Sequence, residues 1–253
     1  MFLYEKSGLK VAEVFFDEPE QPVRADIIRY HHRSQPIAQA RCTGLETLWI
    51  DLSADPDSIL GAMNRDTRYK INRAAKDGVV YEFQRQPDAD WLAQFRDLYD
   101  RFALSKGLAP SNGTRLEAML RQGALDLSRM RGPDGEILVW HAHVRSQQRA
   151  RLLHSASIFR EMEKNAAAVI GRANRLCHWA DMQRFRGEGL ATFDFGGWYG
   201  GNEDQAKLRI NEFKRGFGGA VVPQYNSDRA ATWKGAAALY VRSAVRMIRG
   251  MED

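Results

Sequence analysis

The chain has 253 residues, of which 44% are hydrophobic, and it carries a formal net charge of +5 with a pI near 9.3. This composition supports a hydrophobic core and excludes a disordered or low-complexity chain. Cys42 and Cys177 are too few for a disulfide framework, the first residues lack a long apolar run, and no later segment reaches about 18 consecutive apolar residues. We therefore expect a cytoplasmic protein with reduced thiols, whose basic surface fits an anionic partner such as tRNA, a nucleotide-linked sugar or phospholipid headgroups.

Residues 1–46 are predicted to form an N-terminal extension of irregular structure with short strands, and residues 47–253 the main domain. Strands are expected at 10–16, 27–31 and 48–52, and Pro56 near a first turn opens a helical region that runs to about Asp77. The second half of this region is rich in cations: Arg65, Arg68, Lys70, Arg73 and Lys76. These side chains form either a tract that binds phosphates or a solvated helix face.

The middle of the chain predicts a strand at 79–83, helices at 89–106 and 115–122, and then strands at 125–130, 137–144 and 149–158. Turn sequences at 132–135 and 146–148 join the last three strands into an antiparallel meander, which argues against a purely parallel sheet. His141 and His143 alternate on one strand face, where a core or partner-contact role is expected. Because no cysteine or carboxylate accompanies them at ligand spacing, we predict no metal site.

The last part predicts a long helix at 165–186, in which Cys177 belongs to the inward stripe and His178 to the opposite face. A strand at 192–195, a glycine-rich turn, a helix at about 203–214 and a strand near 220–223 follow. Asn202 and Asp204 are both candidates to cap the 203–214 helix. The final helix, 233–249, either packs against the domain or lies on a membrane surface.

Two stretches of the chain resemble the Fem family, the aminoacyl-tRNA-dependent transferases that add amino acids to peptidoglycan precursors and are relatives of the GNAT acyltransferases. The first, residues 192–219, reads TFDFGGWYGGNEDQAKLRINEFKRGFGG and resembles the family's strand, glycine turn and helix with an F-K motif. The second, residues 68–79, reads RYKINRAAKDGV and is similar to the family's basic helix that runs into K-x-G-V. The two stretches occur in the order that the family has.

The resemblance implies a GNAT-like α/β fold in a single domain, 47–253, with a mixed, mostly antiparallel sheet covered by helices on both faces. The best-known Fem transferases carry two such domains, whereas this length has room for one. A dimer, a partner or nothing would then supply what the other domain contributes to substrate binding. The sequence does not reveal the oligomeric state.

The resemblance also implies an acyltransferase that uses aminoacyl-tRNA as its donor and the amine of a cell-envelope precursor, a sugar-phosphate or another small molecule as its acceptor. GNAT enzymes that use acetyl-CoA bind its pyrophosphate on a glycine-rich turn. The corresponding segment, 158–168, contains no glycine and carries two acidic residues that repel phosphate. We therefore expect no CoA and no other cofactor. An acyl-CoA-dependent N-acyltransferase and a non-catalytic basic RNA-binding or assembly module are the alternatives.

Lys214 matches the lysine of the family's F-K motif, which is associated with acceptor phosphate contact and with charge stabilisation near the reacting carbonyl. Asp194, at the strand end, either orients or deprotonates the amine or accepts hydrogen bonds from the amides of the turn. Lys214 and Asp194 are the catalytic candidates. The substrate-binding candidates are Arg215, Gly196, Gly197, Trp198, Tyr199, Phe213, Lys70, Arg73 and Lys76.

Overall fold

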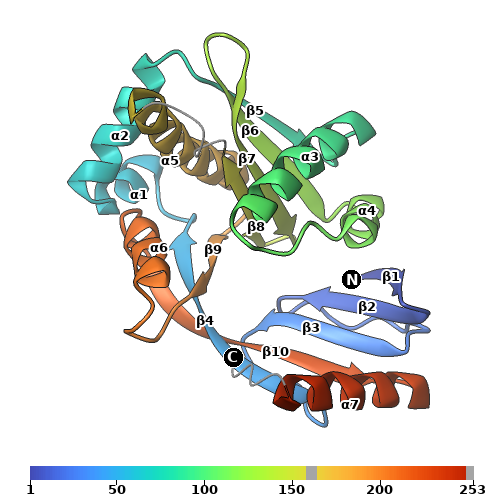
Figure 1. Cartoon of the computed structure of the whole chain (residues 1–253). Helices are drawn as coiled ribbons and strands as arrows, with labels where there is room; N and C mark the ends of the chain where they lie inside the picture. Colours follow the sequence, from blue (N-terminus) through green and yellow to red (C-terminus); the bar gives the residue numbers. More distant parts are fainter. Residues whose placement is uncertain (158–163, 249–253) are drawn as a thin grey trace. The chain divides into compact units, whose positions relative to one another are not determined.

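The computed structural model describes residues 1–157 and 164–248 (Figure 1). The chain divides into two compact units, one formed by 46–222 and one by 1–45 together with 223–253. Residues 223–253 thus group with the N-terminal strands and not with the predicted main domain. Compactness alone does not show that a unit folds independently, so the predicted domain boundaries remain a prediction.

The larger unit, 46–222, holds most of the elements. Its first half contains the end of β4 (Arg41–Asp51), α1 (Pro56–Ala62), α2 (Arg65–Lys76), β5 (Val80–Arg85), α3 (Ala89–Ser105) and α4 (Gly113–Arg121). Its second half contains β6 (Leu125–Arg131), β7 (Ile137–Arg145), β8 (Arg149–Ser157), α5 (Lys164–Gly187), β9 (Thr192–Trp198), α6 (Gln205–Arg215) and the start of β10 (Ala220–Ala230). Most of these bounds lie close to the elements that the sequence predicts. β9 is an exception, because it continues through Gly196 and Gly197 to Trp198, where the sequence predicts a turn, and Gly197 pairs with Thr47 of β4.

The strands of this unit follow the order β4-β9-β8-β7-β6-β5 in the sheet. The predicted meander is confirmed, because β6, β7 and β8 pair antiparallel with their chain neighbours. β5 and β6 also pair antiparallel, as do β4 and β9, whereas β8 and β9 are parallel. The sheet is therefore mixed and mostly antiparallel, as the resemblance implies.

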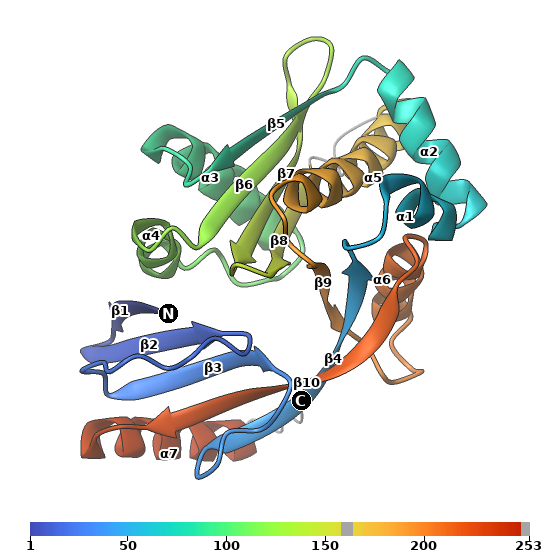
Figure 2. The same cartoon turned by 180° about the vertical axis from the view of Figure 1, so that it is seen from behind.

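Helices cover both faces of this sheet (Figures 1 and 2). Successive side chains of a strand point to opposite faces. Accordingly, His141 of β7 contacts α5 through Asp181, while the next residue back, Trp140, packs edge-to-face on Trp91 of α3 with ring centroids 5.2 Å apart. Phe185 of α5 lies on the first face, where its ring meets Phe83 and Phe193. The alternation of side chains along β7 therefore directs one set toward α3 and the other toward α5, on opposite faces of the sheet.

Side-chain caps determine where the helices of this unit begin. Asp55, Asn64, Asp88, Asn112 and Asp204 each accept a hydrogen bond from a backbone N–H in the first turn. Asn64 explains why the predicted helical region at 55–77 is two helices, since its side chain caps α2 immediately after α1 ends. The Arg68 guanidinium then donates to the carbonyls of Gly61 and Met63 and so closes the end of α1.

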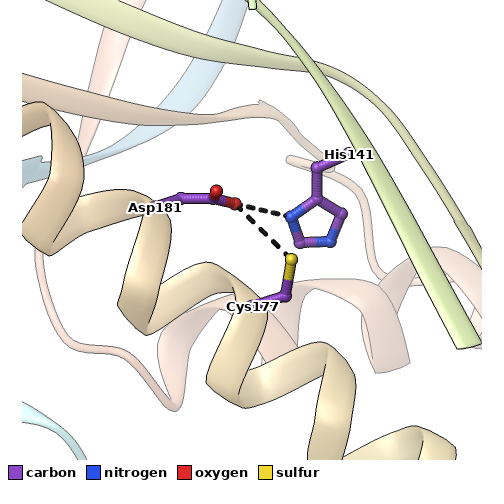
Figure 3. A group of neighbouring side chains, drawn as sticks. All are labelled: His141, Cys177 and Asp181. Carbon is purple, nitrogen blue, oxygen red and sulfur yellow. Dashed lines mark hydrogen bonds and ion pairs between the residues drawn. The ribbon is translucent and has the colours of Figure 1, made fainter. Parts of the chain in front are cut away.

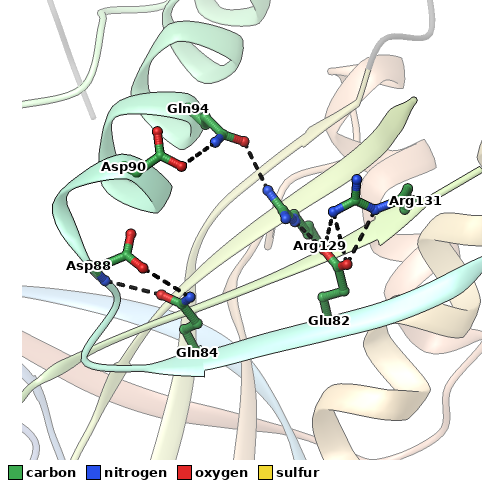
Figure 4. Close-up of polar contacts among 7 residues, drawn as sticks. All are labelled: Glu82, Gln84, Asp88, Asp90, Gln94, Arg129 and Arg131. Carbon is green, nitrogen blue, oxygen red and sulfur yellow. Dashed lines mark hydrogen bonds and ion pairs between the residues drawn. The ribbon is translucent and has the colours of Figure 1, made fainter. Parts of the chain in front are cut away.

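A polar cluster ties the edge strand β5 to β6 and α3 (Figure 4). Glu82 of β5 forms ion pairs with Arg129 and Arg131 of β6, and Arg129 also donates to Gln94 of α3 at 2.9 Å. The Arg129 guanidinium lies 4.2 Å from the centroid of the Trp91 ring. The edge strand is therefore fixed by charge as well as by its one strand neighbour.

The smaller unit consists of β1 (Phe2–Lys6), β2 (Leu9–Phe15), β3 (Ile27–Arg33), the start of β4, the rest of β10 and α7 (Trp233–Ile248). β1 and β2 are antiparallel, β2 and β3 are parallel, and β3 pairs antiparallel with β10. Regular pairing of these strands replaces the irregular structure predicted for residues 1–46. β10 also continues through Pro223 to Ala230, well beyond the predicted 220–223.

In the sheet, β10 lies between β3 and β4 and is hydrogen-bonded to both. The ten described strands therefore form one sheet. None of the helices in the described ranges is both long and apolar enough to cross a bilayer.

Gly219 gives a direct test of backbone packing where β10 begins. It has a φ of 82°, and a Cβ built on it would lie 2.2 Å from the Trp49 carbonyl oxygen. Gly189 has the same φ, but an added Cβ there meets nothing within 4 Å. We expect Gly189→Ala to lower the free energy of unfolding by about 1–2 kcal/mol through backbone strain alone. Gly219→Ala should lose about 1–3 kcal/mol more, because β4 and β10 must separate.

Urea unfolding followed by circular dichroism measures both variants against the unchanged chain. Equal losses for the two alanines would contradict the close approach of Gly219 to β4.

Candidate functional site

The parallel pairing of β8 and β9 brings together three charged residues that are far apart in sequence. The described pairs are Arg149↔Thr192, Ala150↔Phe193 and Arg151↔Asp194. Because Arg149 and Arg151 are two residues apart, they share one face of β8 and meet the Asp194 side chain from β9. Asp194 is fully buried, and the two arginines are nearly so.

Asp194 uses both carboxylate oxygens. Its Oδ2 accepts from the Arg149 guanidinium, and its Oδ1 accepts from Arg151 Nη1 at 2.9 Å and from the Gly196 backbone N–H at 2.7 Å. Gly196 has a φ of 84°, a left-handed conformation that suits glycine. Of the two roles predicted for Asp194, the structure contains the hydrogen bond to a glycine amide, although Gly196 lies within β9 and not in a turn. Since two guanidiniums occupy its oxygens, we interpret Asp194 as a positioning residue for Gly196 and the arginines.

Lys214 stands at the end of α6, facing the glycines of β9. It is half-buried, and its Nζ donates to the Gly197 carbonyl. Burial, followed by the charge of Arg151, lowers the pKa of Lys214 to about 8, although Asp194 acts in the opposite direction. The end of β9 therefore has beside it a partly desolvated ammonium group whose proton is held less tightly than that of an exposed lysine.

The rings of Phe213 and His178 lie beside Lys214, and we call them the aromatic floor of the site. The Phe213 ring lies 5.6 Å from the His178 ring and 5.5 Å from the Phe217 ring, and the Arg175 guanidinium lies 4.8 Å from the centroid of Phe213. His178 was expected on the outer face of its helix, but it is buried, because the aromatic residues of β9 and α6 cover this side of α5. Within the described ranges, its Nδ1 has no hydrogen-bond partner.

His178 connects this floor to a second buried polar cluster. Its ring lies 4.2 Å from that of His141. Burial, followed by the neighbouring His141, lowers the pKa of His178 well below the usual value, with a smaller contribution from Lys214. His178 is therefore a neutral imidazole at pH 7, able to accept or donate one hydrogen bond.

Asp181 is the centre of the second cluster (Figure 3). Its carboxylate accepts from Tyr81 Oη at 2.8 Å and lies 2.7 Å from His141 Nδ1, and His143 Nε2 stands 3.4 Å away. Burial alone raises the pKa of Asp181, but the imidazoles of His143 and His141 outweigh it, so this pKa lies well below its ordinary value. Asp181 is thus a buried carboxylate balanced by neighbouring imidazoles.

The same cluster contains three residue types that bind metals. The ligand atoms of His141, Cys177 and Asp181 lie within 4.8 Å of one another, although their spacing along the chain predicts no metal site. Each of these atoms has a protein partner, since Cys177 Sγ lies 3.9 Å from Asp181 and 3.8 Å from Ser128 Oγ. Burial also raises the pKa of Cys177 well above its usual value, which favours the thiol over the thiolate that metals bind. The ligand atoms of His141, Cys177 and Asp181 are therefore engaged with protein partners.

The loop after β9 is held by α6. Asp204 caps this helix, and Asn211 binds the main chain of Tyr199 twice, accepting from its N–H at 3.1 Å and donating to its carbonyl at 2.7 Å. The Arg215 guanidinium lies 5.0 Å from the centroid of Trp198. The structure therefore gathers these predicted residues, together with Gly196, Gly197, Phe213 and Lys214, around the end of β9 and the loop that follows it.

The predicted basic residues of α2 lie apart from this group. Lys70 pairs with Asp66 at 2.7 Å and Arg73 with Asp77 at 3.6 Å, and Arg73 and Lys76 are exposed. In the part of the chain that the structure describes, no hydrogen bond or ion pair joins them to Lys214 or Asp194. The helix itself does meet the motif, because the Asn64 N–H donates to the Gly216 carbonyl at 2.9 Å.

Sequence reasoning did not identify Arg149, Arg151, His178 or Asp181 as site residues. The arginines lie at the start of a predicted strand, and two arginines at i and i+2 were a usable signal that one strand face is charged. On α5, the polar residues Asn174, Cys177, His178 and Asp181 follow one another at i, i+3, i+4 and i+7, which marks a single polar stripe. Only the pairing of distant elements shows that both sets are buried.

No protein-family model matches the chain, and no curated protein matches it. Solved structures do match. FemX superposes with a TM-score of 0.61 and 15% identity over 77% of this chain and 63% of FemX, so the chain spans less than two thirds of that protein.

Two further structures agree with this likeness. The C-terminal domain (DUF2156) of a putative lysylphosphatidylglycerol synthetase from Agrobacterium fabrum gives a TM-score of 0.54 and 16% identity over 87% of this chain and 72% of that one. L-PGS from Bacillus licheniformis gives a TM-score of 0.53 and 13% identity over 85% of this chain and 71% of that one. These structures confirm the Fem-like, GNAT-like fold that the sequence predicts, and at such identities they show the fold alone.

The buried charge on Asp194 can be tested by Asp194→Asn. The change leaves Arg149 and Arg151 buried without their counter-charge, so we expect the free energy of unfolding to fall by about 3–5 kcal/mol. Asp57→Asn is the matched control, because Asp57 is exposed in the first turn of α1, where the change should cost about 1 kcal/mol or less. Urea unfolding measures both, and similar losses for the two variants would contradict the balancing role of Asp194.

Proposed function

We propose that the chain transfers an aminoacyl group from aminoacyl-tRNA to an amine of a cell-envelope precursor, of peptidoglycan or polysaccharide type, or of another small acceptor. The observation that carries the proposal is the half-buried Lys214 ammonium beside Gly197 near the end of β9, in a position that matches the F-K motif. The fold shared with FemX, with the C-terminal domain of a putative lysylphosphatidylglycerol synthetase and with L-PGS supports transfer of an acyl group.

The transfer reaction requires the protein mainly to position the two substrates and to stabilise a developing charge. Aminoacyl-tRNA is an activated ester, so an acceptor amine attacks its carbonyl carbon directly and the ribose hydroxyl of the tRNA leaves. The intermediate carries a negative charge on the former carbonyl oxygen. A cation placed beside that oxygen and shielded from water lowers the barrier, and no covalent acyl-enzyme is required.

Lys214 is the residue that we assign to this charge. Its ammonium is already partly desolvated and is held by the Gly197 carbonyl, so little reorganisation is needed when the oxyanion forms. Arg151 adds positive potential from β8, and Asp194 keeps Arg151 and Gly196 in place. Trp198, Tyr199 and Phe213 would line the acceptor side, with Arg215 nearby for a phosphate.

The cations of α2, of which Arg73 and Lys76 are exposed and Lys70 is half-buried and paired with Asp66, would supply a place for the tRNA backbone. Lys70, Arg73 and Lys76 stand on the helix whose N-terminus contacts the end of α6. Phosphate contacts of this kind give affinity without sequence specificity and weaken steeply with salt. The argument against the acyl-CoA alternative depends on the absence of glycine from segment 158–168. Residues 158–163 of this segment lie outside the described ranges.

Replacing Lys214 by alanine should lower the rate of aminoacyl transfer by about 10²–10³-fold, as expected for loss of one oxyanion-stabilising group. Lys106→Ala is the control, since Lys106 is an exposed lysine at the end of α3, and it should leave the rate nearly unchanged. The assay follows a labelled amino acid from a mixed pool of charged tRNAs into an envelope-precursor extract. Retained transfer by Lys214→Ala would remove the assignment, and transfer of a labelled acyl group from CoA would favour the alternative donor.

The pKa of Lys214 predicts how the rate depends on pH. If the charged lysine stabilises the oxyanion, kcat should be constant below pH 8 and should fall as the pH rises through about 8. Lys214→Arg should move this fall to higher pH, because arginine stays protonated there. A rate that rises through pH 8 would instead mean that neutral Lys214 acts as a base.

A further inference from the structure

The outward face of α7 is apolar, which is the reverse of an ordinary surface helix. Trp233 and Tyr240 are each 77% exposed, Val241 is 59% exposed and Val245 is 40% exposed. At i, i+7, i+8 and i+12 these four side chains fall along one face of the helix. We call them the α7 apolar face. Large apolar side chains gathered on a surface mark a binding site more often than chance exposure.

The packing of the inner side fixes which way α7 faces. A Cβ on Gly235 would lie 1.9 Å from the Asp26 carbonyl oxygen, so the helix touches the start of β3 at a point where no side chain fits. Thr232 Oγ1 donates to Asp26 Oδ1 at 2.7 Å and holds the beginning of the helix. The helix cannot rotate to bury Trp233 and Tyr240 without losing this contact.

A basic cavity lies against the same helix, within the same unit. It has a volume of about 280 Å³ and is lined by Leu239 and Arg242 of α7 and by residues of β3, β4 and β10 that include Arg29, Arg41 and Asp228. Asp228 lies 3.1 Å from Arg242 and 3.5 Å from Arg29. Three arginines face one aspartate, so the lining has a net positive charge. Figure 2 shows α7 lying along β10, which supplies part of this lining.

We propose that α7 docks this unit on an anionic phospholipid bilayer, with the α7 apolar face in the interface and the arginine-lined cavity at a lipid phosphate. Tryptophan and tyrosine favour the headgroup region of a bilayer, and helices of this type combine an apolar face with cations that attract anionic lipids. Each basic residue near such a surface adds attraction that falls off within a Debye length. The proposal rests on the smaller unit alone and does not depend on the transfer reaction.

The charge of α7 favours a bilayer over a second copy of the chain as the partner of the α7 apolar face. The sequence of α7 contains lysine and arginine but no acidic residue, so two copies packed face to face would bring like charges together. An anionic surface complements the same charges. Val241 and Val245 also offer no group that hydrogen-bonds to a nucleic acid, whereas they gain by leaving water for acyl chains.

Co-sedimentation of the full chain with lipid vesicles tests the proposal. We expect binding to vesicles of phosphatidylcholine mixed with phosphatidylglycerol, weaker binding to phosphatidylcholine alone, and loss of the difference at high salt. The double variant Trp233→Ser, Tyr240→Ser should weaken the partition coefficient by about tenfold or more, because both side chains leave the interface. Leu104→Ser is the matched control, since Leu104 is 82% exposed on α3 in the other unit.

A second variant tests the cavity. Arg41→Gln with Arg242→Gln should reduce the preference for anionic over neutral vesicles while leaving the weaker binding to neutral vesicles in place. Circular dichroism verifies that each variant is folded. The proposal fails if the unchanged chain does not bind anionic vesicles, or if Trp233→Ser, Tyr240→Ser binds as well as Leu104→Ser. It also fails if sedimentation velocity shows a dimer that the same serine variant abolishes. Aminoacyl transfer is not measured here, so failure of the proposed function leaves the result intact.

Discussion

The carboxylate of Asp194 and its two arginines constrain the site more than any other interaction. A fully buried charge is tolerated only where it is paired and hydrogen-bonded, and Asp194 has Arg149, Arg151 and the Gly196 amide around it. Arg149 also lies 4.3 Å from the centroid of the Trp49 ring on β4. One carboxylate thus connects β4, β8 and β9 at the point where the two parallel strands pair.

This charge arrangement reaches the candidate catalytic lysine. Burial lowers the pKa of Lys214 most, the charge of Arg151 lowers it further, and Asp194 raises it, so the pairing of Arg151 with Asp194 adjusts how firmly the partly buried lysine holds its proton. On the other side of Lys214, the neutral His178 links the aromatic floor to the buried Asp181 network. A site that must stabilise a developing negative charge benefits from such a setting, because its cations are fixed and partly removed from water before reaction.

The proposed membrane contact and the proposed transfer have compatible chemistry. An acceptor that carries a lipid remains at the bilayer surface, and a transferase that docks there meets it in two dimensions instead of three. The α7 apolar face and the arginine-lined cavity belong to the smaller unit, whereas Lys214 and Asp194 belong to the larger one. Each proposal therefore has its own residues and its own physical basis.

The sequence by itself determined the local structure and the fold. Apolar periodicity located most strands and helices of the larger unit, but it missed β1, the first half of β4 and most of β10. Turn sequences identified the β6–β8 meander, and the two Fem-like stretches indicated the GNAT-like sheet. These features depend on neighbours along the chain, so propensity and spacing are enough to predict them. Lys214 was found in the same way, through a motif confined to one strand, turn and helix.

Tertiary structure decided what distant elements do to one another. Asp194 meets Arg149 and Arg151 across 45 and 43 residues, and nothing local in the sequence specifies that pairing. His178 looked like an outer-face residue because it is polar, yet packing of β9 and α6 against α5 buries it. The direction of α7 was open as well, since its apolar and basic residues fit either packing or a surface. The contact of Gly235 with the Asp26 carbonyl turns the aromatic side outward, because only a residue without a side chain fits there.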